Sequence, residues 1–264
     1  MIAIIGGGKM GEALLAGLLA TGYEPTQVLV TEPHPDRAAE LRERYGVAAA
    51  PLADSAARAS TLVLAVKPQD MVEVLDDLSP HLKPDCLVVS IAAGITTALL
   101  EKHLPADTPV VRAMPNTPAL VGKGMTAVAA GSHTGDAQLD HAESLLRSVG
   151  DVVRVPEHHM DTVTALSGSG PAYFYFIAET MIEAGVAMGM TRAAARKLVT
   201  QTITGAAEML ADPANHPVVL REAVTSPGGT TAAAVRELER HGVRTAFTEA
   251  IEAARDRSRR LSEG

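Results

Sequence analysis

A glycine-rich hexapeptide near the start of the sequence has the spacing of a dinucleotide-binding turn. Residues 6–11 read Gly-Gly-Gly-Lys-Met-Gly, which fits the pattern G-x-G-x-x-G between a strand-like run and a helical pattern. Gly6 permits the tight turn, Gly8 permits a pyrophosphate to approach the backbone, and Gly11 permits close packing of helix on strand. The N–H groups at a helix start attract phosphate oxygens, so we predict a bound dinucleotide here. A structural turn without a ligand is the alternative.

Two charged residues after the second strand-like run bear on which nicotinamide nucleotide binds. Glu32 ends that run, where an acidic side chain usually binds the ribose 2′-hydroxyl group and favours NAD. Arg37 follows closely, and an arginine near this place accommodates the 2′-phosphate of NADP; an exposed helix residue is its other interpretation. The sequence alone therefore leaves NADH and NADPH both open.

Three loops follow the ends of further strand-like runs. They are residues 65–68 (Ala-Val-Lys-Pro), 92–94 (Ala-Ala-Gly) and 114–118 (Met-Pro-Asn-Thr-Pro). An open α/β sheet presents its ligand crevice at the carboxyl ends of its strands. The small Ala93 and Gly94 permit a flat nicotinamide ring to lie against the backbone, and the prolines stiffen the loops. Each loop alone is ordinary turn chemistry, but the three together favour a bound dinucleotide.

The second half of the sequence carries two further stretches that could do chemistry. Residues 225–231 read Thr-Ser-Pro-Gly-Gly-Thr-Thr and open a predicted helix. Glycines, hydroxyl groups and unpaired N–H groups at a helix start form a site for a carboxylate, and an ordinary helix N-cap is the alternative. Residues 167–171 read Ser-Gly-Ser-Gly-Pro and lead into Tyr173-Phe174-Tyr175-Phe176. We interpret these aromatic residues as core or interface rather than as substrate contacts.

The elements that must position these residues divide the chain in two. Apolar strand-like runs, with helical spacing between them, occur at residues 2–5, 28–30, 62–66, 87–90 and 110–112. A weaker strand–helix–strand set spans about 125–155, and beyond Pro156 the patterns are helical, at about 171–188, 192–211, 230–241 and 244–261. This predicts the α/β class: a Rossmann-type doubly wound parallel sheet in a dinucleotide-binding domain over residues 1–156, then an all-helical domain over 157–264.

Composition excludes several classes of protein. The formal net charge of −8, with a single basic cluster at residues 255–260, argues against nucleic-acid binding. The only cysteine, Cys86, rules out an intrachain disulfide and favours a reducing compartment. No basic leader precedes the first strand and no apolar run reaches the roughly 18–20 residues of a membrane span, so we expect a cytoplasmic protein with no membrane partner.

Six stretches together resemble one family, the pyrroline-5-carboxylate reductases. They are Ile4–Glu12, Ala65–Gln69, Ser90–Ile95, Arg112–Gly122, Leu166–Tyr173 and Val224–Thr231. They occur in the family's order and span nearly the whole chain, and the last of them is the most specific. The resemblance implies an NAD(P)H-dependent imine oxidoreductase that reduces Δ1-pyrroline-5-carboxylate to L-proline, the last step of proline biosynthesis, with NADPH or NADH.

The resemblance also implies roles for particular residues. Cofactor binding falls to the residues of the glycine turn, to Glu32 and to the loops, that is Gly6, Gly8, Lys9, Met10, Gly11, Glu32, Val66, Lys67, Pro68, Ala93, Gly94 and Asn116. The substrate carboxylate falls to Ser226, Gly229, Thr230 and Thr231, with the Thr231 hydroxyl group near the ring nitrogen as the catalytic contact. Glu157 matches an acidic position near the family's substrate pocket, and a solvated glutamate at a helix start is its alternative. Glu32 departs from the small hydroxyl residue that many members carry, which puts NADPH preference in doubt.

The chemistry that the resemblance implies needs few catalytic groups. A cyclic imine that binds already protonated needs no strong general acid, so the site would work by positioning and electrostatics. No histidine or lysine near the motifs suits catalysis, and His158-His159 lacks the spaced partners of a metal site, so we expect no metal. The apolar helical half should bury surface on another subunit, and the resemblance implies a homodimer, often assembled into a decamer, with the substrate pocket at the dimer interface.

Two other functions share parts of this pattern, and the first of them fails on its central residue. A β-hydroxyacid dehydrogenase has a similar plan but needs a lysine with an asparagine four residues on, whereas Lys197 is followed at that distance by Gln201. A dinucleotide-binding regulator without catalytic activity is compatible with the fold but leaves residues 225–231 unexplained.

Overall fold

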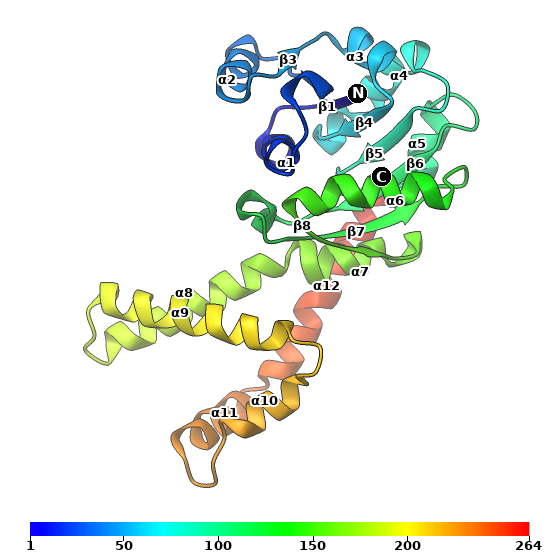
Figure 1. Ribbon diagram of the computed structural model, residues 1–264. Helices are drawn as coiled ribbons and strands as arrows, with labels where there is room; N and C mark the ends of the chain where they lie inside the picture. Colours follow the sequence, from blue (N-terminus) through cyan, green and yellow to red (C-terminus); the bar gives the residue numbers. More distant parts are fainter. Residues whose placement is uncertain (264) are drawn as a thin grey trace. The chain divides into compact units, whose positions relative to one another are not determined.

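A computed structural model describes residues 1–263, which form two compact units (Figure 1). The first unit contains residues 1–169 together with residues 254–263, and the second contains residues 170–253. The predicted domain boundary after residue 156 stays a prediction. The boundary between the compact units lies after residue 169, because residues 157–169 form hydrogen bonds with residues of the first unit. Glu157, for example, bonds to Thr97, and Ser167 bonds to Asn116.

The first unit is built on one eight-stranded sheet. Its strands lie in the order β3-β2-β1-β4-β5-β6-β7-β8. Their bounds are β1 Ile2–Ile5, β2 Val28–Thr31, β3 Ala48–Ala49, β4 Thr61–Leu64, β5 Leu87–Ser90, β6 Val110–Met114, β7 Gly124–Ala130 and β8 Gly150–Arg154. The register places Ile5 opposite both Thr31 and Leu64, so that β1, β2 and β4 end side by side. This is the ligand-binding edge of such a sheet.

The predicted parallel, doubly wound sheet is confirmed, with one exception. All strand pairs are parallel except β6 and β7, which are antiparallel. Only the short segment between Met114 and Gly124 joins these two strands, and a parallel crossover needs a dozen or more residues. The strand β3 escaped prediction because two exposed alanines are too short a run to show the period of a strand.

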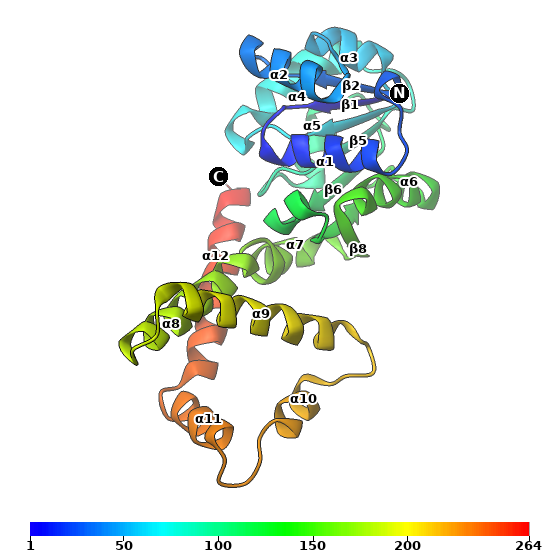
Figure 2. The same ribbon diagram turned by 60° about the vertical axis from the view of Figure 1, so that its left-hand side comes forward.

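Helices cover both faces of the sheet (Figures 1 and 2). One face packs on α1 (Lys9–Ala20), α2 (Pro35–Tyr45) and α6 (Asp136–Leu146), and the other on α3 (Leu52–Arg58), α4 (Met71–Leu78) and α5 (Thr97–His103). Alternate residues of each strand serve the two faces, as Ile4 and Ile5 do in β1. Both side chains are almost completely buried. Burial on two faces is why the strands are continuously apolar in sequence.

Short 3-10 turns and one irregular helix complete the first unit. The 3-10 turns are Pro25–Gln27, Pro68–Asp70, Ser79–His81, Thr117–Val121, Arg147–Val149 and Glu157–His159. The helix α7 (Met160–Val163) widens into a π-helical turn at Thr164–Gly168. Met160 on α7 packs with Ala127 and Ala129 of β7 in a small separate cluster.

The second unit is helical, as predicted, and no strand occurs among the described residues after β8. It contains α8 (Gly170–Ala187), α9 (Arg192–Ala211), α10 (Pro217–Ala223), α11 (Thr230–Arg240) and the first part of α12 (Val243–Glu263). The helices α8 and α9 lie side by side, joined by a turn at Gly189 and in close approach at Gly185 and Ala195 (Figures 1 and 2). Only α10 was not predicted. No helix among residues 1–263 is both long and apolar enough to cross a membrane.

Candidate dinucleotide and carboxylate sites

The glycine turn joins the end of β1 to the start of α1 as its spacing predicts. Gly6 has a φ of +106°, a conformation that side chains disfavour, and a Cβ there would lie 2.7 Å from the Ala65 carbonyl oxygen. A Cβ on Gly11 would lie 2.1 Å from the Gly6 carbonyl oxygen. The turn is therefore closed at these two positions by the chain's own backbone.

Gly8 differs from its neighbours because its surroundings are open. A Cβ on Gly8 would meet no atom within 4 Å, and Gly8 caps α1 without any side-chain hydrogen bond. The first N–H groups of a helix have no partner within it and carry partial positive charge. The open backbone at Gly8, beside these N–H groups on Lys9 and Met10, fits a pyrophosphate group.

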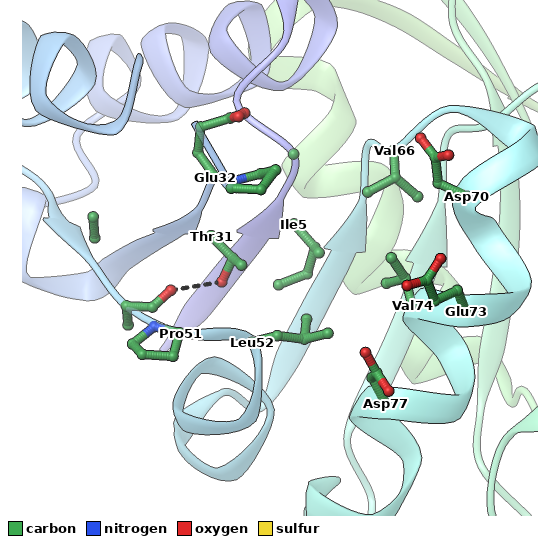
Figure 3. Close-up of a pocket in the computed structure, with 14 residues that line it drawn as sticks. Ile5, Thr31, Glu32, Pro51, Leu52, Val66, Asp70, Glu73, Val74 and Asp77 are labelled. Carbon is green, nitrogen blue, oxygen red and sulfur yellow. Dashed lines mark hydrogen bonds between the residues drawn. The ribbon is translucent and has the colours of Figure 1, made fainter. Parts of the chain in front are cut away.

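A pocket of about 610 Å³ lies beside this turn, at the carboxyl ends of β1, β2 and β4. Its size is that of a small-molecule site. The lining residues are Ile5, Gly6, Thr31, Glu32, Pro33, Ala49, Ala50, Pro51, Leu52, Val66, Asp70, Glu73, Val74 and Asp77. Figure 3 shows Glu73, Val74 and Asp77 on one side of this pocket and Thr31 and Pro51 on the other. We call it the β1–β2–β4 pocket.

The carboxylate of Glu32 is fixed by backbone hydrogen bonds. The Gly7 N–H group donates to its Oε2 atom at 2.8 Å, and the His34 N–H group donates to its Oε1 atom at 3.0 Å. Each carboxylate oxygen can accept a further hydrogen bond. Glu32 thus presents a fixed negative charge to the pocket, and its predicted contact with the ribose stays a prediction.

Arg37 is held by the protein's own carboxylates. Its Nε donates to the Gly7 carbonyl oxygen at 2.9 Å, Nη1 donates to Glu40 at 2.7 Å, and Nη2 donates to Glu12 in a short bond. Arg44 and the Tyr45 hydroxyl group also donate to Glu12, both at 2.9 Å. Chiefly through the bond from Arg37, this network holds the pKa of Glu12 below its ordinary value. Arg37 is therefore half-buried, and not the exposed helix residue that the sequence also allowed.

The predicted loops lie at the ends of β4, β5 and β6. Val66 lines the β1–β2–β4 pocket, whereas Lys67, Pro68 and Ala93 are exposed. Gly94 has a φ of +77°, and a Cβ there would lie 3.5 Å from the Leu261 carbonyl oxygen of α12. The strand order brings these loops to one edge of the sheet, as predicted from their positions after strands.

Asn116 has a structural role that the sequence did not reveal. Its Nδ2 donates to the carbonyl oxygen of Ser167 at 3.2 Å and lies 3.3 Å from the Ser167 hydroxyl oxygen. Its Oδ1 accepts from the Met125 N–H group at 2.9 Å. Asn116 thus ties its loop to β7 and to the π-helical turn, and its predicted place near the nicotinamide stays a prediction.

Glu157 forms an ion pair with a buried arginine. Its Oε1 accepts from Arg112 Nη1 at 2.8 Å and from the Thr97 N–H group at 3.2 Å. Arg112, on β6, is 3% exposed, whereas the Glu157 side chain is 30% exposed. Glu157 is thus neither isolated nor simply solvated, and its predicted contact with the substrate stays a prediction.

The predicted carboxylate site lies in the second unit, at the start of α11. The helix begins at Thr230 with Gly229 as its cap, and no side chain bonds to the cap position. The Gly229 N–H group donates to the Ser226 carbonyl oxygen at 3.0 Å across a turn in which Gly228 has a φ of +71°. The first-turn N–H groups beside Thr231 are therefore free to receive an anion.

Three acidic residues of the pocket escaped prediction. Asp70, Glu73 and Asp77 are spaced by three and four residues, which places them on one face of a helix. That spacing, directly after the loop at residues 65–68, was a usable signal. What it could not tell was that this face borders the β1–β2–β4 pocket.

Comparison with known proteins covers both units. Residues 157–261 match the family described as pyrroline-5-carboxylate reductase dimerisation, and residues 1–94 match NADP oxidoreductase, coenzyme F420-dependent. The chain is 46% identical to pyrroline-5-carboxylate reductase of Corynebacterium melassecola, over 98% of both proteins. It is similar to the solved reductase from Coxiella burnetii at 40% identity, with a TM-score of 0.94, covering 99% of this chain and 98% of that one. A Plasmodium falciparum pyrroline carboxylate reductase with NADP bound is 29% identical, with a TM-score of 0.88, and the match covers 99% and 97%.

Proposed function

The chain belongs to the pyrroline-5-carboxylate reductase family, and from that premise we propose that it reduces Δ1-pyrroline-5-carboxylate to L-proline. The observation that supports this most strongly is the match along nearly the whole chain, which includes both the glycine turn and the start of α11. The reaction is the last step of proline biosynthesis.

The cofactor is a reduced nicotinamide dinucleotide, which supplies the hydride. We propose that its pyrophosphate is held at Gly8 by the N–H groups of Lys9 and Met10, where the backbone is open. The adenosine part would occupy the β1–β2–β4 pocket beside Glu32. The loops after β4, β5 and β6, with Lys67, Ala93 and Asn116, would border the nicotinamide.

The substrate would be bound through its carboxylate. A helix start rich in glycine and hydroxyl groups can hold a carboxylate without a positive side chain, and Ser226, Gly229 and Thr230 provide one. We assign the Thr231 hydroxyl group to the ring nitrogen. An imine that binds already protonated has no need of a stronger acid, so Thr231 acts by holding the ring in place.

The second unit would associate with another copy of the chain. It leaves large apolar side chains exposed on α8 and α9, among them Phe174, Phe176, Met181 and Leu198. An exposed apolar surface of this kind marks an interface, and the matching family is described by its dimerisation. We propose a homodimer that completes the substrate pocket, further assembly into a decamer, and a cytoplasmic location.

Oxidation of NADH and of NADPH by the purified protein, with pyrroline-5-carboxylate supplied, tests the activity directly. We expect consumption of the reduced nicotinamide and one proline formed for each molecule oxidised. Absence of turnover with both cofactors would refute the proposal.

The Thr231→Val substitution tests the substrate contact. We expect kcat/KM for the imine to fall at least about tenfold, because a hydrogen bond to the reacting ring is lost, while cofactor affinity stays unchanged. Thr248→Val is the matched control, since the Thr248 hydroxyl group donates only to the Arg244 carbonyl oxygen of its own helix. Equal losses of imine turnover and cofactor affinity in Thr231→Val would remove Thr231 from the mechanism.

A further inference from the structure

The β1–β2–β4 pocket has a strongly one-sided charge. Glu32, Asp70, Glu73 and Asp77 line it, and no lysine, arginine or histidine is among its described lining residues. The carboxylates come from separate elements, namely the end of β2 and the segment through α4, so they face the space from two sides (Figure 3). Any group bound here enters a negative potential.

Glu32 is the carboxylate nearest to the glycine turn. Its two hydrogen bonds from Gly7 and His34 fix it at the end of β2, next to the turn that would hold the pyrophosphate. A fixed carboxylate accepts a hydrogen bond from a ribose 2′-hydroxyl group. The same carboxylate repels a 2′-phosphate, which carries about −1.5 to −2 charges near neutral pH.

The arginine nearest to Glu32 in the sequence, Arg37, already bonds to other groups of the protein. Each of the three guanidinium nitrogens of Arg37 donates to a protein oxygen, and two of the acceptors are the carboxylates of Glu12 and Glu40. These carboxylates balance its charge, and Arg37 does not line the pocket. Arg44, on the same helix, also pairs with Glu12. No lysine, arginine or histidine among the described lining residues would therefore neutralise a 2′-phosphate bound in this pocket.

From these observations we infer that the chain binds NADH in preference to NADPH, with Glu32 as the residue that determines the preference. The inference rests on the proposed function only in taking the β1–β2–β4 pocket as the place of the adenosine. Coulomb repulsion between one carboxylate and a dianion about 5 Å away, even in water, corresponds to at least about a tenfold difference in affinity.

Binding to the cofactor-free protein, measured by isothermal titration calorimetry without substrate, tests the inference. We expect the Kd for NADPH to be at least about ten times that for NADH, and the ratio to narrow as salt is added. Adenosine 5′-monophosphate and adenosine 2′,5′-bisphosphate serve as probes of the adenosine site alone and should show the same order. Equal or tighter binding of NADPH would overturn the inference.

Three variants assign the preference to its source. Glu32→Ser should bring the two Kd values to within about threefold of each other, mainly by tightening NADPH. Glu43→Ser, which removes an equal charge from an exposed position of α2 outside the pocket, should leave the ratio unchanged. Arg37→Ala should change both affinities by the same factor. A selective loss of NADPH affinity in Arg37→Ala would show that Arg37 binds the 2′-phosphate and would overturn the inference.

The same measurements separate this inference from the proposed function. A protein that discriminates between the two nucleotides but never reduces pyrroline-5-carboxylate would refute the function and leave the preference established. A protein that reduces the imine and binds NADPH at least as tightly as NADH would support the function and refute the preference.

Discussion

Replacing Glu157 with glutamine removes the charge that faces the buried guanidinium of Arg112. Removal of one partner from a fully buried ion pair costs about 3–5 kcal/mol, because the other charge stays buried without compensation. Arg112 is 3% exposed, but the Glu157 side chain is 30% exposed, so water screens part of the interaction. We therefore expect Glu157→Gln to lower the free energy of unfolding by about 2–3 kcal/mol.

A double-mutant cycle with Arg112→Met shows whether the loss belongs to the pair. Met fills much of the same space as Arg without its charge, so the double variant has no buried unpaired charge. It also removes or neutralises two atoms that are buried without a hydrogen-bond partner, Arg112 Nη2 and Glu157 Oε2. The double variant should lose about 1–2 kcal/mol less than the sum of the single variants.

Urea unfolding followed by circular dichroism, without cofactor and at one fixed chain concentration, measures these free energies. A loss below about 0.5 kcal/mol in Glu157→Gln, or strict additivity in the cycle, would refute the structural role of the pair. Steady-state kinetics on the folded variants then address the predicted substrate contact. A KM for the imine that rises in Glu157→Gln but not in Arg112→Met would establish that contact in addition.

Three further predictions follow from single residues. Gly8→Ala should leave the free energy of unfolding within about 1 kcal/mol of wild type but raise the Kd for NADH at least about tenfold, because its Cβ enters open space that a pyrophosphate would occupy. Gly11→Ala should instead destabilise the cofactor-free protein, because its Cβ would meet the Gly6 carbonyl oxygen. Equal effects of the two variants on stability and on NADH binding, both measured by calorimetry, would contradict the assignment. Because Arg37 keeps the pKa of Glu12 below 4.5 in the folded protein, the Glu12 carboxylate stabilises the fold above that pH and loses this effect as the pH falls further. The difference in Tm between wild type and Glu12→Gln should therefore be largest near about pH 7 and shrink toward about pH 3, and a difference that grows on acidification would be contrary to this sign. Burial raises the pKa of the Cys86 thiol to about 11, so a thiol reagent at about pH 8 should react with one group per chain only after unfolding, and rapid reaction of the native protein would show that Cys86 is accessible.

Local features of the molecule were predictable from the sequence because they depend on residues close together along the chain. The strands at Ile2–Ile5 and Leu87–Ser90 have the predicted bounds, since continuous apolar runs between turn residues have few other solutions. The glycine turn and the start of α11 at Thr230 follow from backbone conformation and helix capping within a few residues. The antiparallel direction of β7 against β6 was harder to predict, because it depends on how the short connection between the two strands returns to the sheet.

Only the tertiary structure decided which charges face one another. Glu12 and Arg37 are 25 residues apart, and Arg112 and Glu157 are 45 residues apart, so neither pairing is implied by spacing on one helix or strand. The sequence offered Glu32 for the ribose 2′-hydroxyl group of NAD and Arg37 for the 2′-phosphate of NADP, and it left the choice between the two cofactors open. Packing of α2 against α1 commits Arg37 to Glu12, while the end of β2 leaves Glu32 in the pocket. Motifs thus determined which ligand class binds, whereas the direction of individual side chains, set by long-range packing, decided the charge that the ligand meets.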